Sequence, residues 1–286
     1  EGGDEIQHPL GVNLGGQVRL EGYALASDEV AAGDILQLTL FWRAMNVIQR
    51  RYKVFTHVLD GAGHLVGQRD SEPCGGSSPT DTWREGQQVV DRYGLPIPPA
   101  TPPGEYLIEV GMYNPEDGLR LPLVEGGEAV GDHVILQRVR VVRSRAPAPV
   151  AALGMQRYRT IKGDDIQLLG FSFGRIGSAS WDLQPGDIAE LVLFWQALRR
   201  PPEDLRVLLR IVDKSGQVRL EHSAPPVGGR YPLREWQPEE IVRDIVHLHL
   251  PAGLPPGRYR LLIGWPGASG ARGGSPLNEL LAFVVQ

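Results

Sequence analysis

Cysteine is almost absent from this sequence, and it also lacks the long apolar runs that mark membrane-spanning proteins. The single Cys74 cannot form an intramolecular disulfide, so cysteine usage leaves the redox compartment open. No run of about 18 or more apolar residues is present, and we therefore predict no membrane span within this chain. The chain starts at Glu1 without an initiator Met, and we expect a mature or excised fragment whose targeting segment has been removed.

Positive charge is not in excess either, because 29 Lys and Arg residues stand against 34 Asp and Glu residues and give a formal net charge of -5. A nucleic-acid-binding protein needs a basic face that replaces the counterions around phosphates. The arginine pairs 50–51 and 199–200 fall in expected loops, where charge is typical of a solvated surface. We therefore predict no nucleic-acid partner.

Glycine and proline, by contrast, are abundant, with 36 and 24 residues in a chain of 286. This composition favours many short strands separated by turns over long helices. A single domain usually has roughly 100 to 200 residues, so the length predicts two domains.

An internal repeat explains the length. The stretch GDILQLTLFWRA at 33–44 recurs as GDIAELVLFWQA at 186–197, an offset of 153 positions from Gly33 to Gly186. Apolar residues at every second position of the first copy, from Leu36 to Trp42, indicate a strand with one buried face. We predict that Trp42 and Trp195 are core anchors; the alternative is an exposed platform for stacking sugars.

The same offset relates Trp83 to Trp236, Asp91 to Asp244, and the Pro-Pro-Gly-x-Tyr segments that end at Tyr106 and at Tyr259. A tyrosine directly after such a turn resembles the tyrosine corner of immunoglobulin-like sandwiches. We predict an all-β fold with two tandem antiparallel β-sandwich domains, immunoglobulin-like or jelly-roll-like, related by internal duplication. The predicted domains are residues 1–145 and 151–286, joined by an Ala/Pro linker at 146–150. Residues 1–16 are expected to be a frayed lead-in.

Signals for chemistry are sparse. The sequence contains no Gly-x-Ser-x-Gly elbow, phosphate loop, paired-cysteine site or His-Glu-x-x-His motif, so we predict no catalytic residue and no cofactor. His247 and His249 would share one face of a strand and supply half of a metal site, but no further ligand is evident, and no metal is predicted. Asp60 and Asp213 each open a four-residue connection that closes on Gly and are predicted to be turn residues.

Repeat 1 contains a set of residues that follows the pattern of a known module: Phe41, Trp42, Tyr52, Phe55, His57, Asp60, Asp70, Pro73, Trp83, Asp91, Gly104, Tyr106, Gly111, Tyr113, Gly118, Arg120 and Leu121. On these residues repeat 1 resembles a β-sandwich module found in the extracytoplasmic C-terminal parts of multi-spanning bacterial glycosyltransferases, especially those of Chloroflexus-like bacteria. The resemblance covers most of repeat 1 and implies an accessory domain of a membrane enzyme, with no catalytic residues to carry over. Repeat 2 departs from the pattern at the positions of His57 and Tyr113, where it has Arg210 and Pro266.

The first functional hypothesis is therefore a noncatalytic, extracytoplasmic accessory or binding module, associated with the membrane through other parts of a larger glycosyltransferase. Its partner would be a glycan or a protein surface, and its ligand contacts would be polar residues specific to repeat 1. Two alternatives are a purely structural spacer or protein-interaction domain, and a glycoside hydrolase that uses Asp70 and Glu72. The candidate ligand-binding residues are His57, Arg69, Asp70, Glu72, Tyr113 and Arg120.

Overall fold

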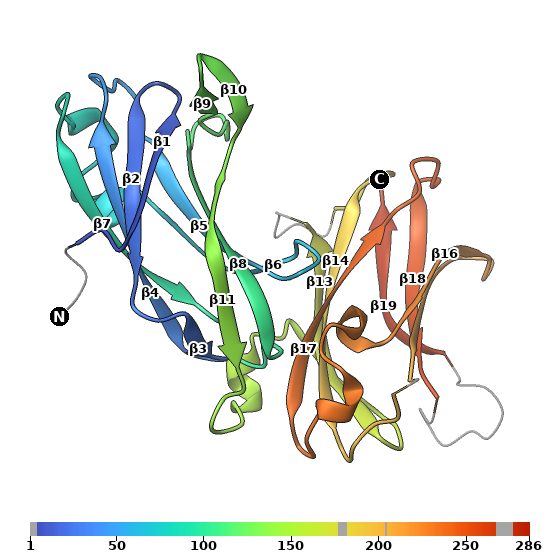
Figure 1. The fold of residues 1–286 in the computed structure, drawn as a ribbon. Helices are drawn as coiled ribbons and strands as arrows, with labels where there is room; N and C mark the ends of the chain where they lie inside the picture. Colours follow the sequence, from blue (N-terminus) through green and yellow to red (C-terminus); the bar gives the residue numbers. More distant parts are fainter. Residues whose placement is uncertain (1–4, 177–181, 204, 267–276) are drawn as a thin grey trace. The chain divides into compact units, whose positions relative to one another are not determined.

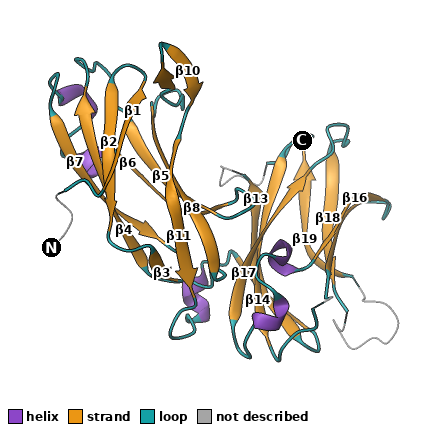
Figure 2. Cartoon of the chain, viewed as in Figure 1, coloured by secondary structure: helices purple, strands orange, loops and turns teal. Residues whose placement is uncertain are grey.

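The computed structural model describes residues 5–176, 182–203, 205–266 and 277–286. In these residues the chain is all-β, which confirms the predicted class, and its helices are short 3-10 turns (Figure 2). None of these helices is long and apolar enough to cross a membrane. The chain divides into two compact units: unit 1 comprises residues 1–98 and 103–143, and unit 2 comprises residues 99–102 and 144–286.

Unit 1 consists of two sheets (Figure 1). The apolar side chains of their facing sides form its core. The first sheet has the order β10-β9-β1-β2-β4-β7, and the second has the order β3-β11-β8-β5-β6. All their pairings are antiparallel except β3 with β11. The elements are β1 (His8–Leu14), β2 (Val18–Leu25), β3 (Glu29–Ala31), β4 (Ile35–Ala44), β5 (Lys53–Leu59), β6 (Leu65–Ser71), η1 (Pro73–Gly76), η2 (Thr80–Thr82), β7 (Gln88–Pro96), β8 (Gly104–Tyr113), β9 (Leu123–Glu125), β10 (Glu128–Gly131) and β11 (Val134–Val142).

The expectation of a frayed lead-in over residues 1–16 is wrong, because β1 lies within it. Only Leu14 of this strand is buried, so the side chains carry little signal. The strand exists because its backbone pairs with β2 on one side and meets β9 at Leu123 on the other. Main-chain hydrogen bonding of this kind does not depend on an alternating apolar pattern.

In its described residues, unit 2 has two four-stranded antiparallel sheets, with the orders β12-β13-β14-β17 and β16-β15-β18-β19. Its core comes from both sheets and includes Trp195 and Trp265, whose rings meet edge to face with centroids 5.1 Å apart. The elements are η3 (Val150–Leu153), β12 (Arg157–Lys162), β13 (Ile166–Arg175), β14 (Ile188–Ala197), β15 (Val207–Asp213), β16 (Val218–Ala224), η4 (Pro226–Gly229), η5 (Leu233–Glu235), β17 (Ile241–His249), β18 (Gly257–Gly264) and β19 (Asn278–Val285).

Each unit buries one tryptophan against one aspartate. Trp42 and Trp195 are both 0% exposed, which confirms that they are core anchors and not sugar-stacking platforms. The Trp42 indole donates a hydrogen bond to the buried carboxylate of Asp91 (3.3 Å), and the Trp195 indole donates one to Asp244 (3.1 Å). Asp91 also accepts from the backbone N–H of Cys74 (2.8 Å) and thereby ties the η1 turn to the core. A buried carboxylate needs such donors to offset its desolvation.

Two further predictions about local structure are confirmed. The Tyr259 hydroxyl donates to the carbonyl of Pro255 (2.6 Å), which is the hydrogen bond expected of a tyrosine corner. The Asp60 carboxylate accepts from the backbone N–H groups of Ala62 and His64 (2.8 and 2.9 Å) and therefore closes its turn.

Candidate functional site

The outer face of the five-stranded sheet in unit 1 carries an unusual set of side chains. Alternation along β5 directs Val54, Thr56 and Val58 into the core, where all three are 0% exposed. Phe55 and His57 therefore point to the opposite face of the sheet. Phe55 is nevertheless only 1% exposed, so other groups cover it on this outer face.

Strand register brings residues from three strands together around Phe55. Phe55 on β5 lies between Asp70 on β6 and Gly111 on β8. One row along, His57 lies opposite Glu109. Residues that are distant in sequence become neighbours here because directly paired residues of antiparallel strands share a face.

The third row brings in the segment that follows β8. Lys53 is paired with Tyr113, and Tyr113 forms an isolated antiparallel bridge with Arg120. The loop 114–119 closes through a backbone hydrogen bond from Asn114 to the carbonyl of Leu119 (2.9 Å), which returns the chain toward the sheet. Arg120 is consequently placed beside the outer face, although it lies outside any named strand.

Seven polar side chains form a continuous series across this face, which we call the outer-face network. His133 Nδ1 lies 2.7 Å from Asp132 Oδ1, and that oxygen is 3.5 Å from Arg120. Arg120 contacts Glu109 Oε1 at 3.3 Å, and the same oxygen is 3.4 Å from His57 Nδ1. The other imidazole nitrogen of His57 is 3.8 Å from Asp70, whose carboxylate accepts a hydrogen bond from the Tyr113 hydroxyl. The network is His133, Asp132, Arg120, Glu109, His57, Asp70 and Tyr113.

Three side chains of the network pack against the Phe55 ring. The Arg120 guanidinium carbon lies 4.3 Å from the centre of the Phe55 ring, a cation–π contact. The rings of His57 and Tyr113 are centred 4.8 and 6.5 Å from that of Phe55. Phe55 also covers Gly111, because a Cβ at Gly111 would collide with the end of the Phe55 ring. A larger residue at position 111 would therefore have to displace the Phe55 ring.

The two central carboxylates are in different electrostatic environments. The hydrogen bond with His57 lowers the pKa of Glu109 below its ordinary value, and it outweighs burial, which acts in the opposite direction. Burial raises the pKa of Asp70, and the nearby His57 and the hydrogen bond from Tyr113 only partly offset this effect. Glu109 is thus the internal anion of the network. Asp70, on β6, is the more exposed of the two carboxylates, because its side chain is 29% exposed and that of Glu109 is 10% exposed.

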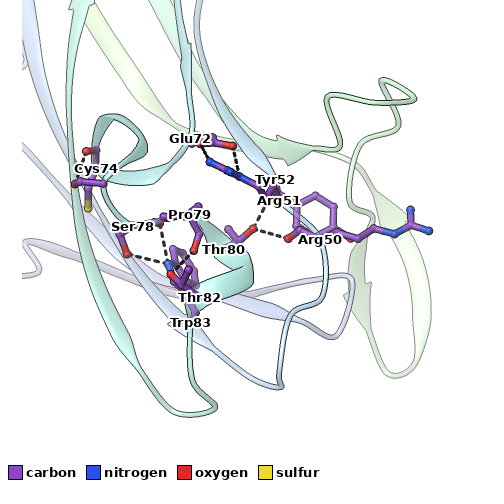
Figure 3. Close-up of polar contacts among 11 residues, drawn as sticks. Arg50, Arg51, Tyr52, Glu72, Cys74, Ser78, Pro79, Thr80, Thr82 and Trp83 are labelled. Carbon is purple, nitrogen blue, oxygen red and sulfur yellow. Dashed lines mark hydrogen bonds and ion pairs between the residues drawn. The ribbon is translucent and has the colours of Figure 1, made fainter.

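Two candidate residues lie apart from the network. Arg69 is paired with Thr56, a core-facing residue whose hydroxyl donates to the Arg69 carbonyl (2.6 Å), so Arg69 lies on the face opposite Asp70. Glu72 follows the end of β6 and accepts a bidentate pair of hydrogen bonds from Arg51, the longer of 2.8 Å (Figure 3). The structure thus brings together His57, Asp70, Tyr113 and Arg120 but not Arg69 and Glu72.

Glu72 helps to hold the segment between β6 and β7. Further along this segment, the buried hydroxyl of Thr80 accepts from the Tyr52 N–H (2.9 Å) and donates to the Arg50 carbonyl (2.7 Å). The Trp83 indole donates to the Ser78 carbonyl at 2.9 Å (Figure 3). Together with the Arg51–Glu72 pair, these contacts anchor the segment between β6 and β7.

Sequence reasoning did not single out three residues of the network: Glu109, Asp132 and His133. Glu109 carries a detectable signal, because it is an acid in the middle of an apolar strand and its counterpart in the repeat is Leu262. Asp132 and His133 carry none, since they enter the network only through the fold of the segment that precedes β11.

Unit 2 has a different arrangement at the corresponding positions. Arg210 replaces His57, is paired with Leu262, and forms an ion pair with Glu221 (2.7 Å). His247 lies 3.2 Å from Glu190. Throughout the described ranges, no group of three or more His, Cys, Asp and Glu side chains is placed to hold a metal ion.

A comparison of the chain with known protein families finds no match, and a comparison with curated proteins finds none. The fold of the described residues defines the class, a two-unit, all-β protein.

Proposed function

We propose that this chain is a noncatalytic, extracytoplasmic accessory module of a larger membrane-associated glycosyltransferase, and that unit 1 binds carbohydrate through its outer-face network. The observation that carries the binding proposal is the convergence of His57, Asp70 and Tyr113 on one sheet face around Phe55. The accessory role and the location rest on the resemblance of repeat 1 to glycosyltransferase-associated modules.

Asp70 is the proposed ligand contact. Tyr113 and His57 hold its carboxylate on the terminal strand of the sheet, with part of its surface open to solvent. A carboxylate accepts hydrogen bonds from two neighbouring hydroxyl groups, and vicinal hydroxyls are what sugars present. Aromatic rings beside oriented polar groups are the usual lining of a small-molecule site. Glu109, being internal, positions His57 and Arg120 and does not contact ligand in this proposal.

The test is binding of the whole chain to an array of neutral oligosaccharides, followed by calorimetry on the best ligand. We expect Asp70→Asn to weaken binding at least tenfold, because a hydrogen bond to a charged acceptor contributes roughly 1.5 to 3 kcal/mol. Tyr113→Phe should weaken it less, since the ring remains.

Glu85→Gln is the matched control, because Glu85 is an exposed acid of unit 1 outside the network. It should bind as the unmodified chain does. No binding to any oligosaccharide, or undiminished binding by both variants, would overturn the carbohydrate proposal and favour the structural spacer.

A further inference from the structure

Strand β12 forms one end of its sheet in unit 2 and carries a concentration of positive charge. It is terminal in the order β12-β13-β14-β17 among the described strands, and five of its six residues are exposed. From Ala146 to Gly163 the sequence contains Arg157, Arg159 and Lys162 but no acidic residue. This local excess contrasts with the net charge of -5 for the whole chain.

Tyr158 lies within this basic strand and is 63% exposed. It is the only aromatic residue among the exposed large hydrophobic side chains of the described chain. Its cross-strand partner is Gly170, so no neighbouring side chain of β13 at that position covers the ring. An exposed tyrosine ring offers an apolar surface for stacking together with a polar hydroxyl.

Lys162 shares a face with Tyr158. Their partners on β13 are Gln167, which lies between Ile166 and Leu168, and Gly170, which directly precedes Phe171. Ile166, Leu168 and Phe171 are 0% exposed and face the core, so the positions of Gln167 and Gly170 face away from it. Arg159 lies in the β-bulge between Tyr158 and Ile161 and is exposed. Neither Arg159 nor Lys162 forms an ion pair with another described residue.

The acids that follow β12 in sequence form no ion pair with Arg159 or Lys162 among the described residues. In the turn after β12, Asp165 is bound by Arg199, and Asp164 is the nearest remaining acid in sequence. In unit 1 the corresponding strand is β1, which contains neither lysine nor arginine and meets β9. The basic, exposed strand is therefore specific to unit 2.

We propose that the β12 surface, formed by Tyr158, Arg159 and Lys162, binds an acidic polysaccharide. The cations fit carboxylate or sulfate groups, and the ring fits the apolar face of a sugar. The bulge disfavours the competing occupant, an acidic peptide added as a further strand, because a bulged edge interrupts the regular ladder. This site is independent of the outer-face network in unit 1.

The test measures binding of the full chain to polygalacturonate by calorimetry, with methyl-esterified polygalacturonate as the uncharged counterpart. We expect binding to the acid form only, weakened when NaCl is raised from about 0.02 to about 0.5 M. The double variant Arg159→Gln/Lys162→Gln should lose about fivefold for each charge removed. Tyr158→Ala should weaken binding at constant charge, while Asp70→Asn should leave it unchanged.

Lys214→Gln/Arg258→Gln removes the same charge from exposed positions elsewhere in unit 2 and should bind as the unmodified chain does. Equal losses in the two double variants, or no binding to polygalacturonate, would overturn the proposal. It would also be overturned if poly-L-glutamate bound as tightly and Tyr158→Ala had no effect. That result would identify an acidic peptide as the occupant. Because Asp70→Asn is measured in parallel, failure here is separable from failure of the neutral-sugar site.

Discussion

Glu109 occupies a position where a charge is expensive, on the outer face of a sheet but only 7% exposed. Its cost is offset locally, since one carboxylate oxygen lies within 3.4 Å of both His57 and Arg120. Removing the charge from such a residue leaves its partners with a poorer acceptor. Glu109 therefore links β5, β8 and the segment around Arg120 through a single side chain.

We expect Glu109→Gln to lower the free energy of unfolding by about 1–2 kcal/mol at pH 7. Because the folded-state pKa of Glu109 is lowered, its contribution is present above the ordinary value of 4.5 and is lost as the pH falls through the lowered pKa. The deficit of the variant should therefore shrink below about pH 4.5. Urea unfolding followed by tryptophan fluorescence between pH 3.5 and 7.5 measures this, and a deficit that grows toward acid pH would contradict it.

At the scale of elements, the second strand of each unit shifts its register against the next strand at a glycine. Strand β2 shifts register against β4 between Leu20 and Gly22, and β13 shifts against β14 between Leu168 and Gly170. A Cβ at Gly22 would lie 2.5 Å from the His8 carbonyl oxygen. At Gly170 it would lie 2.7 Å from the sulfur of Met155 and would collide with the Arg157 carbonyl oxygen. Both glycines thus allow the neighbouring strand, β1 or β12, to approach closely.

Gly22→Ala and Gly170→Ala should each destabilise the protein by about 1–3 kcal/mol, because the added methyl group overpacks against backbone. The controls are Gly253→Ala, where a Cβ would meet nothing within 4 Å, and Gly131→Ala, where it would make an ordinary contact of 3.7 Å with Leu123. These should change stability by less than about 0.5 kcal/mol. Denaturant titrations of the four variants test the difference, and equal effects in all four would exclude the steric explanation.

At the scale of the molecule, each unit has its own core. The large buried cluster of unit 2 runs from Ile161 to Val285 and takes no residue from positions before 161. Leu20 and Leu168 hold corresponding places in the two units, and each is 0% exposed. The chain passes between the two units at 98–99, 102–103 and 143–144, but the cores are separate, and separate cores are expected to unfold separately.

Calorimetry should therefore show two transitions. Leu168→Ala should lower only one of them, by roughly 10 °C, since a buried Leu→Ala change costs about 2–5 kcal/mol. Leu20→Ala should lower only the other. Movement of both transitions together in either variant would show that the units unfold as one.

The sequence was sufficient wherever the physics is local. Alternation in the repeated strand identified Trp42 and Trp195 as core residues, and side-chain chemistry identified the Asp60 turn and the corner at Tyr259. These features depend on contacts within a strand or a few residues along the chain. Duplication of a whole domain, the Ala/Pro boundary and the resemblance to glycosyltransferase modules stay predictions.

Tertiary structure decided which side chains meet. Asp70 and Glu72 are two positions apart in the sequence, which suggested one acidic pair. Because β6 ends between them, Asp70 lies near His57, whereas Glu72 forms an ion pair with Arg51. Glu109 became central only because β8 is paired with β5 in a register that sets it opposite His57. Period-two alternation determines which residues of one strand share a face. The partners across that face depend on strand order and register, which arise from long-range pairing and packing of the whole sheet.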